Sequence, residues 1–124
     1  YKEAIPVQHL IYMLNVAIGG KERITLEEIG GVLGESLKKE ETLTRLQIAR
    51  LMPYLTDKYA CFFEIKEGMP FIPDIESLSA KDQENIKFTV RRGILGAPNT
   101  IYRPNDKLTW QEAACMASRL LEGK

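Results

Sequence analysis

Three segments of the chain repeat the pattern that begins an α-helix, and this repetition constrains the fold more than any other feature. Each segment has an apolar residue, a threonine, two further residues and then Glu or Gln; the three are Ile24–Glu28, Leu43–Gln47 and Leu108–Glu112. A threonine in this position accepts a hydrogen bond from the backbone three residues on, and the Glu or Gln reaches back to the threonine N–H. The pattern therefore predicts three helices, each capped by its threonine.

The residues that follow each threonine have the period of a helix, because apolar side chains recur every three or four positions. The same period predicts two further helices, one over 7–18 that is closed by two glycines and one over 79–93. Pro53 is expected to end or kink the helix that follows Thr44. Residues 57–74 lack the period and contain Gly and Pro, so we expect a connector with at most a short pair of strands. The sequence therefore predicts a mainly α protein.

The order of the predicted elements repeats between the two halves of the chain. Each half has a helix ending in Gly, a loop and a Thr-capped helix, and the helix after Thr44 aligns without gaps with the helix after Thr109. We therefore expect a helical bundle of two helix-loop-helix repeats, the first of which contains an extra short helix at 25–37. The expected units are residues 1–56 as the first repeat, 57–70 as an irregular or β connector and 71–124 as the second repeat.

The charge of the chain argues against binding to nucleic acid. Its 124 residues include 17 Lys and Arg against 17 Asp and Glu; residues 1–62 carry 8 of each sign and residues 63–124 carry 9 of each. Binding to a phosphate backbone needs an excess of cations, so a helix-turn-helix DNA-binding domain is disfavoured. No apolar run approaches the roughly 20 residues of a membrane-spanning helix. The chain begins with Tyr1 rather than Met, which indicates a processed protein or a fragment.

No pattern in the sequence indicates catalysis or a metal site. His9 is the only histidine, and no Ser or Cys stands at a known spacing from it. Cys61 and Cys115 are far apart, and they could form one disulfide or stay as buried thiols. Calcium loops, Cys-x-x-Cys pairs and phosphate-binding glycine loops are absent from the sequence. We therefore expect a protein that is not an enzyme and that uses no cofactor and no metal.

The second half of the chain contains four short motifs in a fixed order. They are Phe71 with Pro73-Asp74-Ile75, then Gly93-Ile94, then Tyr102-Arg103-Pro104, and finally Leu108-Thr109-Trp110-Gln111-Glu112. In this order and spacing, residues 71–122 resemble a repeat of the S-layer homology family, in which a Phe-x-Asp-Val element precedes a helix ending in Gly-Ile, a Phe/Tyr-x-Pro turn and an Ile/Leu-Thr-Arg-x-Glu helix start. Residues 5–55 resemble the family more loosely, through Leu43-Thr44-Arg45-Leu46-Gln47.

The resemblance implies a helical module of a secreted or cell-surface bacterial protein. Repeats of this family attach proteins non-covalently to cell-wall polysaccharide, and an Arg with nearby acidic and aromatic residues binds an acidic, often pyruvylated, sugar. A guanidinium suits this task because it presents a rigid bidentate fork to a carboxylate. The candidate glycan-binding residues that the resemblance implies are Thr44, Arg45, Asp74, Arg103, Trp110 and Glu112.

Three of these residues also have a structural interpretation. Arg45 could be an exposed residue in the first turn of its helix, Asp74 could cap the turn after Pro73, and Trp110 could lie in the core. The chain also departs from the family, because Trp110 replaces the motif Arg of the second repeat and Ser77-Leu78-Ser79 replaces a His-Trp pair.

The number of repeats leaves the function open. The family's repeats usually come in threes, so a third repeat lies outside this chain, or the chain forms a homo-oligomer, or the fold serves another purpose. The alternative to glycan binding is therefore a degenerate module that acts as a structural or protein–protein interaction domain of a larger extracellular protein.

Overall fold

The computed structural model describes residues 2–19, 23–68 and 70–123, and it is mainly helical, as predicted. The described residues form five α-helices and one π-helical turn, with three isolated β-bridges and no strand. The elements are α1 (Val7–Leu14), which continues into η1 (Asn15–Gly19), α2 (Leu26–Leu33), α3 (Arg45–Lys58), α4 (Ala80–Arg91) and α5 (Trp110–Glu122). Gly20, the second glycine of the predicted helix stop, lies outside the described residues.

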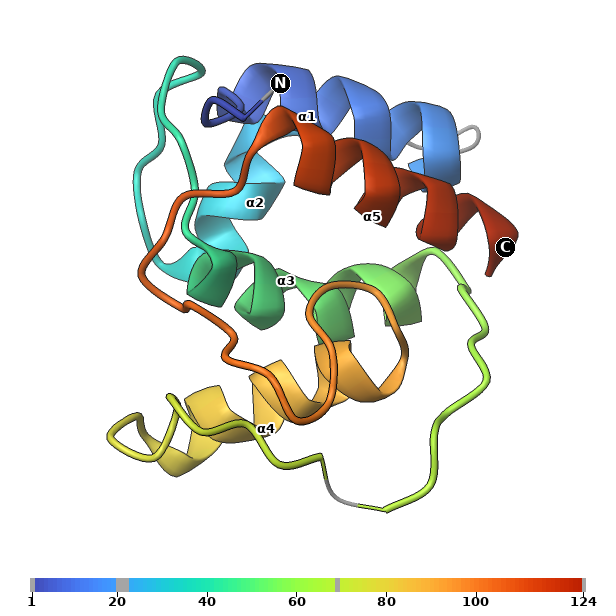
Figure 1. The fold of residues 1–124 in the computed structure, drawn as a ribbon. Helices are drawn as coiled ribbons and strands as arrows, with labels where there is room; N and C mark the ends of the chain where they lie inside the picture. The colour runs from blue at the N-terminus through green and yellow to red at the C-terminus, as the bar shows by residue number, and fades with distance from the viewer. Residues whose placement is uncertain (1, 20–22, 69, 124) are drawn as a thin grey trace.

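The helices pack around one core. Figure 1 shows α1 and α5 side by side and running in the same direction, with α3 beneath them and α4 on the far side of α3. The buried apolar residues of α1, α3, α4 and α5 belong to a single cluster, as do those of the loops between them. Residues of both expected repeats, 1–56 and 71–124, contribute to this cluster. The division of the chain into two repeats and a connector stays a prediction.

The predicted threonine caps are formed at all three helix starts, but only two are complete capping boxes. In α3 and α5 the Thr44 and Thr109 hydroxyls accept from the backbone three residues on, and Gln47 and Glu112 bond back to the threonine N–H. In α2 the Thr25 hydroxyl accepts from Glu28 N at 3.1 Å. The Glu28 carboxylate lies elsewhere, because it accepts from Tyr54 Oη at 2.5 Å and Lys58 Nζ at 2.6 Å of α3.

Two other local expectations are corrected. The helix predicted at 25–37 ends earlier, at Leu33, because Gly34 takes the left-handed conformation with φ 71°. Of the two outcomes expected at Pro53, an end of the helix is wrong, because α3 continues to Lys58, and a kink stays a prediction. The connector contains no strand among its described residues, although Phe62 N donates to Gly123 O at 2.6 Å and thereby ties the connector to the end of α5.

The chain segments that lead into α1, α3 and α5 pair with one another at the side of the bundle where these helices begin (Figure 1). Their β-bridges connect them pairwise: Ala4 with Thr109, Pro6 with Thr42, and Thr44 with Lys107. The residue before each N-cap is fully buried; these residues are Ile5, Leu43 and Leu108. We refer to residues 3–7, 41–46 and 104–110 as the three-segment junction.

The start of α1 resembles the starts of α3 and α5, the two helices that the sequence aligned with each other. Its N-cap is Pro6, and the buried Ile5 occupies the position of Leu43 and Leu108. The main chain joins all three, because Ile5 N donates to Leu108 O at 3.0 Å and Leu108 N donates to Leu43 O at 2.8 Å.

Candidate functional site

The loop before α5 and the first turn of α3 bring most of the predicted residues together. Arg45 is the first residue of α3, and its N–H donates to Asp106 O at 2.9 Å, while Leu46 N donates to Pro104 O at 2.9 Å. These bonds hold the loop over 102–106 across the start of α3. The Tyr-x-Pro motif of one repeat therefore lies against the Thr-Arg motif of the other.

Arg45 is at the centre of this contact, and it is buried rather than exposed as its structural interpretation assumed. Its side chain is 4% exposed, its Nε donates to Tyr102 O at 2.6 Å, and its Nη1 forms an ion pair with Glu112. The guanidinium carbon lies 4.9 Å from the centre of the Tyr102 ring.

The Tyr102 hydroxyl donates in turn to Arg45 O at 2.8 Å. Burial raises the pKa of Tyr102 far above its usual range, so this hydroxyl stays protonated and remains a donor. The side chain of each residue therefore donates a hydrogen bond to the backbone carbonyl of the other.

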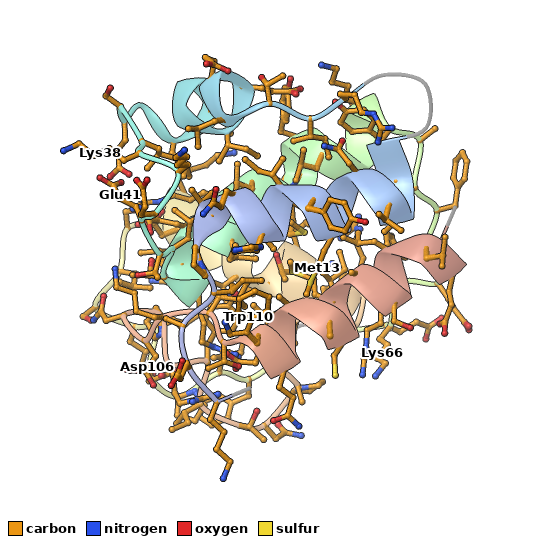
Figure 2. The ribbon with its side chains drawn as sticks, turned by 90° about the horizontal axis from the view of Figure 1, so that it is seen from above. Met13, Lys38, Glu41, Lys66, Asp106 and Trp110 are labelled. Atoms are coloured by element: carbon orange, nitrogen blue, oxygen red, sulfur yellow. The ribbon has the colours of Figure 1, made fainter. Side chains whose placement is uncertain are left out.

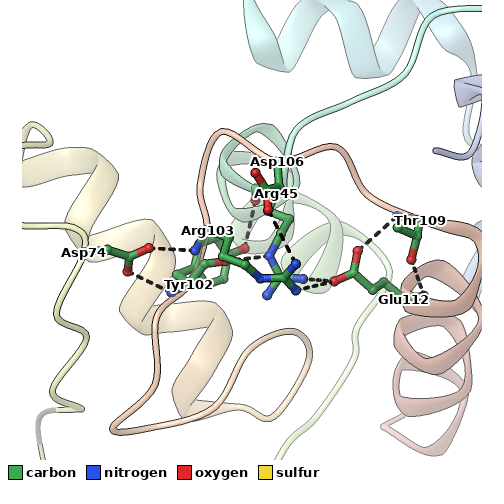
Figure 3. Close-up of polar contacts among 7 residues, drawn as sticks. All are labelled: Arg45, Asp74, Tyr102, Arg103, Asp106, Thr109 and Glu112. Atoms are coloured by element: carbon green, nitrogen blue, oxygen red, sulfur yellow. Dashed lines mark hydrogen bonds and ion pairs between the residues drawn. The ribbon is translucent and has the colours of Figure 1, made fainter. Parts of the chain in front are cut away.

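Glu112 joins this buried arginine to the surface (Figure 3). Its Oε1 accepts from Thr109 N at 3.0 Å, as part of the α5 capping box. Its Oε2 accepts from Arg45 and, at 3.1 Å, from Arg103 Nη2. One carboxylate thus caps a helix and pairs with two guanidinium groups, which together keep one positive charge in excess.

Asp74 positions Arg103 through the backbone. Its two oxygens accept from Tyr102 N and Arg103 N, each at 2.8 Å, as Figure 3 shows. Arg103 itself has φ 60°, a left-handed conformation that is uncommon for a residue with a side chain. Asp74 therefore holds a strained backbone 29 residues further along the chain.

A groove of about 270 Å³ opens beside this network. Arg45, Arg103 and Glu112 line it together with residues of α5 and of the turn after α4; these are Ile94, Leu95, Gly96, Gln111, Cys115 and Arg119. Glycine is favoured at position 96, since its φ is 81° and a Cβ there would lie 3.0 Å from the Tyr102 ring. Three guanidinium groups and one carboxylate therefore line one small groove, which suits an anionic ligand.

The remaining predicted residues lie outside the groove. Thr44 caps α3. Trp110 is half-buried against the core, with its ring 5.0 Å from the ring of His9. The core interpretation of Trp110 therefore describes its position better than a sugar-stacking role does.

Sequence reasoning did not select Arg119, which lines the groove and donates from Nη1 to Gly93 O. Its spacing could have identified it. Arg119 is seven residues after Glu112, and residues seven apart lie on one face of a helix.

The described residues show neither a metal site nor a membrane span. The part of the chain that the structure describes has no group of three or more His, Cys, Asp or Glu side chains placed to bind a metal, and none of its helices is long and apolar enough to cross a membrane. Cys61 and Cys115 are not joined by a disulfide. Comparisons with protein-family models, with curated proteins and with solved structures find no match to this chain.

Proposed function

We propose that this chain is a non-catalytic module that anchors a secreted bacterial protein at the cell surface by binding an anionic cell-wall polysaccharide. The observation that carries the proposal is the groove beside α5, which is lined by Arg45, Arg103 and Arg119 and by one carboxylate, that of Glu112. Asp106, which does not line the groove, also pairs with Arg103, at 3.4 Å. This excess of positive charge is local, because the whole chain is electrically balanced.

The groups in the groove differ in what they can offer a sugar. Arg103 is 47% exposed, so its guanidinium can meet a carboxylate of the ligand, whereas Arg45 is 4% exposed and serves to orient Glu112. A guanidinium–carboxylate contact is directional and charge-assisted, which makes it one of the stronger polar contacts available. Arg103 and Arg119 are therefore the residues that we expect to bind the anionic group.

The arrangement of the three-segment junction supports the same proposal. The S-layer homology repeats that the sequence resembles usually come in threes, and the sequence contains motifs for two. The buried start of α1 at Ile5 and Pro6 supplies a third helix of the same kind.

The proposal is tested by sedimentation of the protein with purified secondary cell-wall polymer from a Gram-positive bacterium. We expect wild-type protein to sediment with the polymer, and the double variant Arg103→Ala/Arg119→Ala to lose at least about 10-fold in affinity, since two charge-assisted contacts are removed. Arg23→Ala, which removes an exposed arginine that does not line the groove, should bind as the wild type does. Equal binding by all three proteins would show that the groove is not the polysaccharide-binding site.

The burial of Arg45 favours a second candidate, a structural or protein–protein interaction module. A guanidinium that is 4% exposed and bonded to Glu112 and to Tyr102 O holds two segments of the fold together without any ligand. This candidate predicts that wild-type protein does not bind the polymer at all, and that light scattering detects a homo-oligomer or a complex with a protein of the same cell surface.

A further inference from the structure

The groove beside α5 continues into a second and larger one. This second groove has a volume of about 750 Å³ and lies between the C-terminal half of α5, the connector residues Phe62, Phe63 and Lys66, and the turn at Arg92-Gly93. Cys115 and Arg119 line both grooves, so the two adjoin along one face of the helix. We refer to the pair as the α5 groove.

The length of the α5 groove exceeds the size of one sugar ring. Its lining runs along α5 from Gln111 to Glu122, which are 11 residues apart. At about 1.5 Å per residue this is roughly 16 Å of helix. A ligand that contacts both ends must therefore be a chain of linked units.

The second part of the α5 groove is also rich in positive charge. Lys66, Arg92 and Arg119 line it, against the single carboxylate of Glu122. Arg92 is held in place, because its Nη1 donates to Phe88 O at 3.2 Å and its guanidinium carbon lies 3.5 Å from the centre of the Phe88 ring. Five cationic residues and two acidic ones line the whole groove, in a chain with 17 of each sign.

The walls of the second part suit a sugar chain. On the α5 side three of the lining residues are small, namely Ala114, Cys115 and Ser118, so a ligand can approach the helix closely between the longer Arg119 and Glu122. On the connector side Phe63 packs against the core, and Phe62 is 78% exposed. Apolar and aromatic surface combined with a few charged groups is the usual composition of a binding site for a small organic ligand.

We propose that the second part of the α5 groove is a subsite for a further anionic sugar, so that the ligand is an anionic oligosaccharide bound along α5. This proposal rests on the proposed function, since the same ligand occupies the first part. The residue that we use to distinguish the subsite is Lys66, which lines the second part of the α5 groove and not the first. Figure 2 labels its position.

The test is calorimetric titration with size-fractionated fragments of a pyruvylated secondary cell-wall polymer. We expect fragments of several sugars to bind wild-type protein about 10-fold more tightly than the pyruvylated monosaccharide, the gain that one additional charge-assisted contact gives. Lys66→Glu should lose this gain and bind the monosaccharide as the wild type does. Lys38→Glu makes the same charge change on the opposite side of the molecule and should preserve the gain (Figure 2).

A second variant tests the same subsite by its shape. Ser118→Trp places a large ring in the second part of the groove, and it should weaken binding of the long fragments without changing the affinity for the monosaccharide. Because Ser118 is exposed, this substitution disturbs no core contact.

Equal affinity of the wild type for short and long fragments would overturn the subsite and leave the proposed function intact. So would unchanged binding of the long fragments by both Lys66→Glu and Ser118→Trp. If wild-type protein binds neither fragment, the proposed function fails and the subsite fails with it.

Discussion

At the scale of single residues, Glu112 connects more of the fold than any other side chain of the site. It bonds to the Thr109 N–H at the start of α5, to the buried Arg45 of α3 and to the exposed Arg103 of the preceding loop. Its capping bond needs only an oxygen, whereas its two ion pairs need the charge. The two contributions can therefore be separated by substitution.

Glu112→Gln keeps an oxygen for the Thr109 N–H and removes the charge opposite Arg45. Because Arg45 is 4% exposed, its guanidinium is left without a counter-charge, and we expect a loss of about 2 kcal/mol in the free energy of unfolding. The measurement is urea denaturation followed by circular dichroism. Asp106→Asn removes a carboxylate that is 59% exposed beside Arg103, and it should cost less than about 1 kcal/mol. Similar small losses of unfolding free energy in Glu112→Gln and Asp106→Asn would show that the ion pair between Arg45 and Glu112 does not stabilise the fold.

At the scale of secondary-structure elements, the packing of α4 on α3 includes a polar contact of good geometry. Arg50 of α3 donates from Nε and Nη2 to the two oxygens of Asp82, each at 2.9 Å. Asp82 lies in the first turn of α4, where its N–H also donates to the capping hydroxyl of Ser79 at 3.1 Å. The Arg50 guanidinium holds the pKa of the Asp82 carboxyl below its usual range.

The lowered pKa of Asp82 makes this contact dependent on pH. A carboxyl whose pKa is lower in the folded than in the unfolded state stabilises the fold above the unfolded pKa of about 3.9, and this stabilisation is lost as the pH falls through the folded value. We therefore expect Asp82→Asn to cost about 1 kcal/mol or less at pH 6, because Arg50 is 39% exposed, and the difference from the wild type to shrink as the pH is lowered toward 2.

Urea denaturation at several pH values measures this difference. Glu76→Gln removes an exposed carboxylate from the loop before α4 and controls for the loss of one negative charge. A difference between wild type and Asp82→Asn that is the same at pH 6 and pH 2 would show that the pair with Arg50 is not its cause.

At the scale of the whole molecule, the N-terminal residues are part of the central packing. Ile5 is 1% exposed, because its segment pairs with the segments before α3 and α5 in the three-segment junction. The fold therefore depends on this short segment as it depends on its long helices.

Ile5→Ala should lower the free energy of unfolding by about 3 kcal/mol, the usual cost of removing a large buried aliphatic side chain. Tyr12→Ala, seven residues further on in α1, removes a side chain that is 71% exposed and should change stability by less than about 0.5 kcal/mol. Thermal denaturation followed by the fluorescence of Trp110, the only tryptophan, compares the two. A larger loss for Tyr12→Ala would mean that the outer face of α1 is covered in solution.

The sequence could predict the parts of this fold that depend on near neighbours. The caps at Thr44, Ser79 and Thr109 involve residues within three positions, and all are formed. The place of α1 beside α3 and α5 was not predicted, because Pro6 stands where the other two helices have threonine. A proline supplies no hydroxyl, so the capping pattern is absent although the helix start is equivalent.

The candidate site was predictable only in part, because many of its contacts join residues that are far apart in the sequence. Motif resemblance selected Arg45, Arg103 and Glu112, which the structure brings into one groove. It could not predict the burial of Arg45, which depends on the ring and carbonyl of Tyr102, 57 residues away. Lys66 was beyond sequence reasoning as well, since its position depends on how the connector packs against α5.

The three-segment junction also has a consequence for how the chain folds. Helical proteins usually fold in microseconds to milliseconds, because most of their contacts join residues that are near in sequence. Here the bridge between Ala4 and Thr109 joins residues 105 positions apart, and Thr44 and Lys107 are 63 apart. Closing such long loops costs entropy before any bond of the junction can form. We expect the individual helices to form early, the junction to close last, and the overall folding rate to be that of a mixed α/β domain rather than of a simple bundle.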